Sequence, residues 1–185
     1  MRKILSILIL ITSFGSLING QVDPLAESIM NKFSEKALGS NAITIEFDML
    51  VTDAIEETET EESGEIVISK DRYKLLLPGN TVWYDGSATY TLVPDVEELT
   101  ITEPDPQSEA FLSKPSLLFT MYREGYKVRL IEEKNNETLI DLYPEDLSAE
   151  FSRVRLSIAK DYSLNMAEYK RKDGITILIS VKEYN

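Results

Sequence analysis

The sequence WYDGSATYTLVPD, residues 83–95, decides the fold that we expect for this chain. It holds two runs of β-prone side chains separated by Asp85-Gly86, and a turn at Pro94-Asp95 leads into a further such run over 96–102. Asp-Gly between two such runs is typical of a tight hairpin, because the turn requires a positive φ at its centre. The stretch therefore predicts three consecutive antiparallel strands.

The same succession of strands and turns extends over most of the chain. In 42–52, for example, apolar and polar residues alternate from Ile43 to Val51. Because the turns are short and no helix follows each strand, we expect an antiparallel meander. A long meander tends to curl into a barrel or half-barrel, since an open sheet leaves unpaired edges. The eleven predicted strands are 42–52, 64–69, 72–77, 80–84, 87–93, 96–102, 126–133, 137–143, 153–159, 163–171 and 174–182.

Two segments outside these strands have other patterns. The first, 23–38, is predicted to be a helix, with Asp23 as its N-terminal cap and Gly39 just after its end. Apolar residues recur at every fourth position of this helix, which predicts one buried face. The second segment, 107–122, is rich in apolar residues and is expected to be helical or irregular, with a break at Pro115.

Residues 53–62 contain five glutamates. A site for a hard cation and a solvated hairpin tip are the two interpretations of such a cluster. The spacing lacks the order of acidic residues that a calcium loop requires, and mutual repulsion keeps the carboxylates in water. We therefore expect a solvated hairpin tip.

The N-terminus has the pattern of an export signal. Basic residues at positions 2 and 3, a short apolar run over 4–11 and small residues up to Gly20 are typical of a secretory signal peptide. The apolar run is shorter than a membrane-spanning helix requires. We expect 1–20 to be a signal peptide that is cleaved, with an uncleaved anchor as the alternative, and 21–185 to form one domain.

Composition excludes several classes of function. The formal net charge of the chain is −13, and without 1–20 it is −15, which argues against nucleic acid and anionic lipid surfaces as partners. The chain contains no Cys and no His, and thus no disulfide scaffold, no thiolate metal site and none of the commonest general bases. Acidic pairs such as Asp141 and Glu145 occur in most acidic proteins and do not indicate a glycosidase. We expect a protein that is not an enzyme and needs no cofactor or metal.

Several short motifs follow one another in a characteristic order. The alternating strand 43–47 comes after the first helix, and 63–66 (SGEI) and 70–75 (KDRYKL) follow it. The hairpin with Tyr84-Asp85-Gly86, Tyr90 and Pro94 comes next, and 114–119 (KPSLLF) is the last motif. In order and spacing these motifs resemble the periplasmic outer-membrane lipoprotein carrier family, LolA, over nearly the whole chain after residue 20.

The resemblance implies a mainly β fold: a half-open antiparallel barrel of about eleven strands, with the N-terminal helix and a mid-chain helical segment that acts as a lid. It implies a periplasmic carrier that binds lipoprotein acyl chains in an apolar cavity and takes them from the inner to the outer membrane. The implied partners are an inner-membrane lipoprotein-releasing ABC transporter and an outer-membrane acceptor. We expect the protein to be a monomer.

Large, adaptable side chains are the candidates for lining such a cavity, because an acyl chain needs a dry and elastic surface. For each of them, ordinary core packing is the alternative, and alternation alone does not tell which strand face is concave. The candidates for binding lipid are Phe47, Met49, Trp83, Tyr90, Leu92, Phe119 and Met121.

The family usually carries an arginine in a strand region that helps to control opening. The corresponding stretch of this sequence offers Lys70, Arg72 and Lys74, which alternate onto one predicted face and are the candidates for control of the lid. A polar outer face that balances nearby glutamates is the alternative interpretation. Two other functions remain open: a periplasmic binder of free lipid or glycolipid, and a structural protein of the envelope whose own side chains fill the cavity.

Overall fold

Eleven antiparallel strands form one sheet in this computed structural model, which describes residues 23–103, 115–134 and 136–185. The first six strands are β1 (Ile43–Asp53), β2 (Thr58–Ser69), β3 (Arg72–Leu77), β4 (Asn80–Tyr84), β5 (Thr89–Val93) and β6 (Glu98–Thr102). The other five are β7 (Tyr126–Lys134), β8 (Glu137–Pro144), β9 (Phe151–Ala159), β10 (Leu164–Arg171) and β11 (Ile175–Tyr184). The predicted mainly β fold with eleven strands is confirmed.

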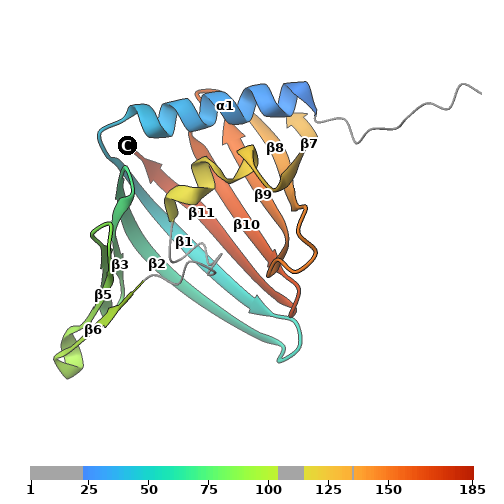
Figure 1. The fold of residues 1–185 in the computed structure, drawn as a ribbon. Helices are drawn as coiled ribbons and strands as arrows, with labels where there is room; N and C mark the ends of the chain where they lie inside the picture. Colours follow the sequence, from blue (N-terminus) through green and yellow to red (C-terminus); the bar gives the residue numbers. More distant parts are fainter. Residues whose placement is uncertain (1–22, 104–114, 135) are drawn as a thin grey trace, which may run out of the picture.

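The strand order places the first and last strands of the chain at the centre of the sheet. It runs β6-β5-β4-β3-β2-β1-β11-β10-β9-β8-β7. Strands that are adjacent in this order are consecutive in sequence, with the exception of β1 and β11. β6 and β7 are the two ends of this order, and the sheet is not closed between them in the described part of the chain. Figure 1 shows β3 to β6 turned out of the plane of the central strands, which gives the sheet a concave side. This is the half-open barrel that the sequence predicts.

The helix α1 (Pro24–Gly39) lies across one end of the sheet (Figure 1). Its N-terminus is capped as predicted, because the Asp23 side chain accepts hydrogen bonds from the backbone N–H groups of Leu25 and Ala26 at 3.1 and 3.3 Å. Its buried face consists of Ala26, Met30, Phe33, Ser34 and Ala37. Among the helices of the described residues, none has the length and apolar character needed to cross a membrane.

Two short 3-10 helices, η3 (Pro115–Phe119) and η4 (Met121–Arg123), connect the two halves of the sheet. Pro115 begins the first of them, in line with the predicted break, whereas residues 107–114 of the predicted segment lie outside the described residues. The signal peptide expected at 1–20 also lies outside them.

The structure corrects the prediction that 53–62 form a hairpin tip. Only residues 54–57 form the turn, and β2 already begins at Thr58, so the last three glutamates of 53–62 belong to a strand instead of a hairpin tip. The ladder tolerates them because their partners on β1 are uncharged: Glu59 pairs with Thr52, Glu61 with Leu50 and Glu62 with Met49.

The hairpin at Asp85-Gly86 is present, but its second strand is shorter than predicted. One carboxylate oxygen of Asp85 accepts hydrogen bonds from the backbone N–H groups of Ser87 and Ala88 at 2.8 and 3.0 Å, so the ladder starts only at Thr89. Gly86 supplies the positive φ that the turn requires, at 102°. The strand predicted to start at 96 starts at Glu98, because Pro94–Val96 forms the short 3-10 helix η1.

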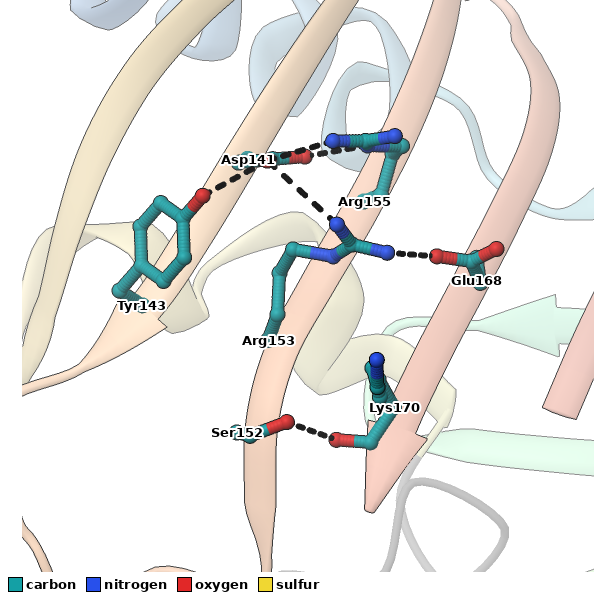
Figure 2. Close-up of polar contacts among 7 residues, drawn as sticks. All are labelled: Asp141, Tyr143, Ser152, Arg153, Arg155, Glu168 and Lys170. Atoms are coloured by element: carbon teal, nitrogen blue, oxygen red, sulfur yellow. Dashed lines mark hydrogen bonds and ion pairs between the residues drawn. The ribbon is translucent and has the colours of Figure 1, made fainter. Parts of the chain in front are cut away.

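A buried carboxylate joins three strands on the convex side of the other half (Figure 2). Asp141 on β8 is fully buried and accepts two hydrogen bonds from Arg155 on β9, at 2.6 and 2.8 Å, and one from the Tyr143 hydroxyl at 2.9 Å. Arg153 lies 4.0 Å from the same carboxylate and forms an ion pair with Glu168 on β10. The network thus links β8, β9 and β10 through their side chains.

Burial raises the pKa of Asp141, but the hydrogen bonds from Arg155 and Tyr143 and the positive charge of Arg153 outweigh burial, so that this pKa lies below its ordinary value of 3.8. The carboxylate is therefore ionised at neutral pH and fully paired. The ionised carboxylate has no proton to donate as a general acid at this pH.

We expect this network to make the free energy of unfolding depend on pH. Because the pKa of Asp141 is lower in the folded state, its contribution to the free energy of unfolding is present above pH of about 4 and is lost as the pH falls further. Arg155→Met leaves the buried carboxylate without its main partner and should lower the free energy of unfolding by about 3 kcal/mol at pH 7. Urea unfolding of both proteins between about pH 7 and pH 2 measures this. A difference that does not shrink at the acidic end would contradict the proposed role of Asp141.

Candidate functional site

An apolar cavity of about 280 Å³ lies between the concave side of β1 to β5 and the 3-10 helix η3. Strands β10 and β11 contribute to its wall from the other half of the sheet. The described residues that line it are Ile45, Phe47, Met49, Ile66, Ile68, Tyr73, Leu75, Leu77, Asn80, Val82, Thr89, Pro115, Leu118, Phe119, Leu164, Ala167 and Ile179. Only Tyr73, Asn80 and Thr89 among them have polar side-chain atoms.

Strand register explains why these side chains share one space. Ile45 pairs with Ile66, and Ile66 with Leu75, and Leu75 with Val82, so one row of apolar side chains crosses β1 to β4 on the concave side. Alternation along each strand then brings every second residue to this side. The cavity is therefore a direct product of the meander and does not depend on loops.

A neighbouring row contains a glycine where a side chain would fill the space. Phe47 pairs with Gly64, and a Cβ atom at Gly64 would lie 2.9 Å from the Phe47 ring and 2.8 Å from the backbone oxygen of Leu76. The missing side chain leaves room for the Phe47 ring beside β2. Gly64 thus sets the shape of the cavity at this point.

The chemistry of the lining determines what can occupy the cavity. Apolar cavities of about 150 Å³ stay dry and bind small apolar molecules, and this cavity is almost twice as large. Burial raises the pKa of Tyr73, and its hydrogen bond with Thr89 offsets part of that rise, so the phenol is neutral at physiological pH. The described lining presents no charge to an occupant.

The cover over the cavity is attached to α1 by both apolar and polar contacts. The rings of Phe119 and Phe33 lie 5.3 Å apart, centroid to centroid. The Tyr122 hydroxyl donates a hydrogen bond to Asn31 at 2.6 Å, and the Arg123 guanidinium donates one to the Ser34 hydroxyl at 3.0 Å. These contacts hold η3 and η4 over the concave side.

Three residues that the sequence predicted for lipid binding line the cavity: Phe47, Met49 and Phe119. Met121 packs against the core and is not among the lining residues. Whether the lining residues bind lipid stays a prediction, but the structure brings these three together from β1 and η3, which are about seventy residues apart in sequence.

The other three predicted residues, Trp83, Tyr90 and Leu92, lie on the opposite face of the sheet. Val82 and Thr89 point to the cavity, so their neighbours in sequence point away from it. Trp83 and Tyr90 stack on each other outside, with ring centroids 5.4 Å apart and planes inclined by 7°. Because β4 has apolar residues on both faces, alternation could not tell which face was concave.

The outer position of these residues gives the end of the sheet an apolar convex face. Leu92 pairs with Leu99, and Tyr90 with Ile101, which are 51% and 60% exposed on the edge strand β6. Sequence analysis missed several lining residues on the concave side of β3 and β4, among them Leu75, Val82 and Asn80. The alternation in 72–77 could have found Leu75, because it places Leu75 on the strand face that does not carry Arg72 and Lys74.

The three candidates for control of the lid do not share one strand face as predicted. Lys70 has a φ of 57° and belongs to the turn between β2 and β3, where it lines a small hollow beside Phe119. Arg72 and Lys74 are exposed on β3, on the face opposite Tyr73 and the cavity. The turn breaks the alternation on which the prediction depended. The described contacts of the cover with α1 involve Arg123 instead.

Comparison with known proteins supports the fold. A protein from Thermus thermophilus, described as an uncharacterized conserved protein, has a similar structure with a TM-score of 0.53 and 14% identity, over 87% of this chain and 86% of that one. A LolA superfamily protein from Nitrosomonas europaea matches with a TM-score of 0.44 and 11% identity, over 86% of this chain and 92% of that one. The lipoprotein LppX from Mycobacterium tuberculosis matches with a TM-score of 0.47 and 12% identity, over 88% and 96%. No protein-family model and no curated protein matches the sequence.

These identities are low, and the likeness is one of fold. The half-open, eleven-stranded arrangement with a helix across one end is the architecture that the sequence resemblance implied.

We predict that Gly64→Ala lowers the free energy of unfolding by about 2 kcal/mol, because the new methyl group overlaps the Phe47 ring and a fixed backbone oxygen. Gly39→Ala at the end of α1 is the matched control, since a Cβ atom there has no neighbour within 4 Å. Chemical unfolding of both variants measures the difference. Equal stability of Gly64→Ala and the wild type would show that the space at Phe47 is not tightly filled.

Proposed function

We propose that this protein is a carrier that binds lipoprotein acyl chains in the cavity behind η3. The observation that carries the proposal is the uncharged cavity on the concave side of the sheet, lined mostly by apolar side chains from β1 to β4, β10, β11 and η3. The order of sequence motifs that resembles the LolA family supports it independently. A carrier of this kind needs no catalytic group.

The energetics of acyl burial favour a cover that opens when a chain enters. One buried methylene contributes about 0.8 kcal/mol, so a chain of about sixteen carbons could gain about 12 kcal/mol when fully buried. Binding of that strength would prevent release. If the chain must displace Phe119 and separate η3 from α1, part of that gain is offset and transfer becomes possible.

The direction of transport follows from the signal peptide that we infer at 1–20 and from the resemblance. We propose a periplasmic location, a lipoprotein-releasing ABC transporter of the inner membrane as donor, and an acceptor at the outer membrane. The net charge of −15 after cleavage would keep the carrier away from anionic lipid surfaces between these encounters.

A binder of free lipid or glycolipid is the second candidate, because the same dry cavity would accept an acyl chain of any origin. A structural envelope protein is a third. The test is purification from the native host, followed by mass spectrometry of the bound material and a release assay with inner-membrane vesicles.

The lipoprotein carrier predicts an acylated peptide in the bound fraction and release of lipoprotein from the vesicles. Bound lipid without a peptide would favour the second candidate. Absence of any bound lipid, together with failure to release lipoprotein, would refute the carrier.

We predict that a bulky side chain inside the cavity blocks binding of an apolar ligand. Val82→Trp places an indole ring on the cavity side of β4 and should weaken binding of a fluorescent apolar probe by at least about tenfold, which corresponds to about 1.4 kcal/mol. Thr81→Trp places the same ring on the opposite face of the same strand and should leave binding unchanged. Titration of both variants with the probe, with thermal unfolding as a check on the fold, measures this. Equal loss in both variants would refute the cavity as the binding site.

A further inference from the structure

One polar atom of a residue that lines the cavity lacks a hydrogen-bond partner in the described part of the chain. The Oδ1 atom of Asn80 is buried and accepts no hydrogen bond from the described residues, although Asn80 lines the cavity. The two other polar side chains of the described lining, Tyr73 and Thr89, are hydrogen-bonded to each other. A buried acceptor without a donor is costly, and such atoms in folded proteins normally have a partner. Because Asn80 lines the cavity, an occupant that reaches this oxygen would supply the missing donor.

The position of Asn80 places this acceptor at the rim. Asn80 begins β4 directly after the exposed turn at Pro78-Gly79, and it pairs with Leu77 across the β3–β4 hairpin. Leu77 in turn lies over Gly64, the partner of Phe47, so the amide belongs to the row of the cavity that contains the Phe47 ring. Asn80 itself is only half-buried, which leaves it within reach of the solvent side.

The end of the cavity beneath α1, away from Asn80, is apolar. Ile68 is 5% exposed and lies in the region where Ala37 and Leu38 of α1 meet Phe119, and both Ile68 and Phe119 line the cavity. The cavity thus has an apolar end beneath α1 and one free hydrogen-bond acceptor at the other end. An occupant that fits this arrangement is amphipathic and enters with its apolar end first.

We propose that Asn80 is a specificity-determining residue, and that the cavity selects a single apolar chain whose polar end carries an O–H or N–H donor for the Asn80 amide oxygen. This inference rests on the proposed lipid-binding function and narrows its substrate class. A hydroxyl group of a fatty alcohol and the N–H of an amide-linked acyl chain supply the same donor. A chain that ends in an ether or a tertiary amide has only acceptors and leaves the Asn80 oxygen unpaired.

The test uses two pairs of ligands that differ only in the donor. Dodecanol is compared with dodecyl methyl ether, and dodecanamide with N,N-dimethyldodecanamide, by displacement of a fluorescent apolar probe from the wild-type protein. We expect the donor-bearing member of at least one pair to bind about tenfold more tightly, because it satisfies a buried acceptor that the other member leaves unpaired. A preference in the alcohol pair alone assigns a hydroxyl lipid, and one in the amide pair alone assigns an amide-linked chain.

A matched variant locates the effect. Asn80→Leu keeps the shape of the side chain and removes the acceptor, so the two members of a pair should bind with equal affinity and the donor-free member should bind no worse than it does to the wild type. Thr81→Val, on the opposite face of β4, should keep the wild-type preference. The comparison of ligands on the wild-type protein needs no variant, so it shows whether the cavity prefers a donor-bearing ligand even if Asn80→Leu is unstable.

The outcomes separate this inference from the proposed function. Binding of all four ligands with no preference for a donor, or a preference for the donor-free members, would overturn the role of Asn80 and leave lipid binding intact. Failure of all four to displace the probe would overturn both.

Discussion

The pairing of β1 with β11 is the interaction on which the rest of the structure depends. It extends from Ile45 opposite Tyr184 to Asp53 opposite Ile175, and two hydrogen bonds of 2.9 Å between Thr44 and Asn185 continue it. Among the described strands, every other pair joins neighbours in sequence, so of these ladders the β1–β11 ladder is the one that connects the two halves of the meander within the sheet. It also brings the cavity residues of β1 beside those of β10 and β11.

Once the two halves of the sheet are joined, their concave side encloses a space that the side chains of the strands do not fill. Apolar side chains from both halves face it, and η3 covers it through Phe119, which packs against Phe33 of α1. The charged network of Asp141, Arg155 and their neighbours lies on the convex side, where its members pair with one another. This separation leaves a dry space for a guest, which a tightly packed core of the same residues would not.

Local sequence patterns predicted most of the architecture. The alternation from Ile43 to Val51 specified β1, and Asp23 marked the start of α1. Gly39 is the last residue of the helix instead of the residue after it, and Ser40 is the C-terminal cap. The β1–β11 ladder could not be derived in this way, because it joins residues more than a hundred positions apart and depends on the curvature of the whole sheet. The length of the meander indicated a barrel or half-barrel, and the resemblance to a known fold implied the half-open one.

The site was predictable in part, and for a physical reason. The alternation in 42–52 placed Phe47 and Met49 on the apolar face of their strand, and the structure shows that this face is the concave one. Trp83, Tyr90 and Leu92 lie on strands with apolar residues on both faces, and their outward direction is set by the register with β3 and not by their own hydrophobicity. Asn80 carried no signal in the sequence, because an asparagine after Pro-Gly is also an ordinary turn residue.

The most direct measurement of the central claim is a crystal structure with dodecanol that carries a bromine atom on its terminal carbon. The account predicts one strong anomalous peak inside the cavity, among Ile68, Leu118 and Phe119, beneath α1. Bromine density only on the outer face, beside the stacked rings of Trp83 and Tyr90, would contradict it.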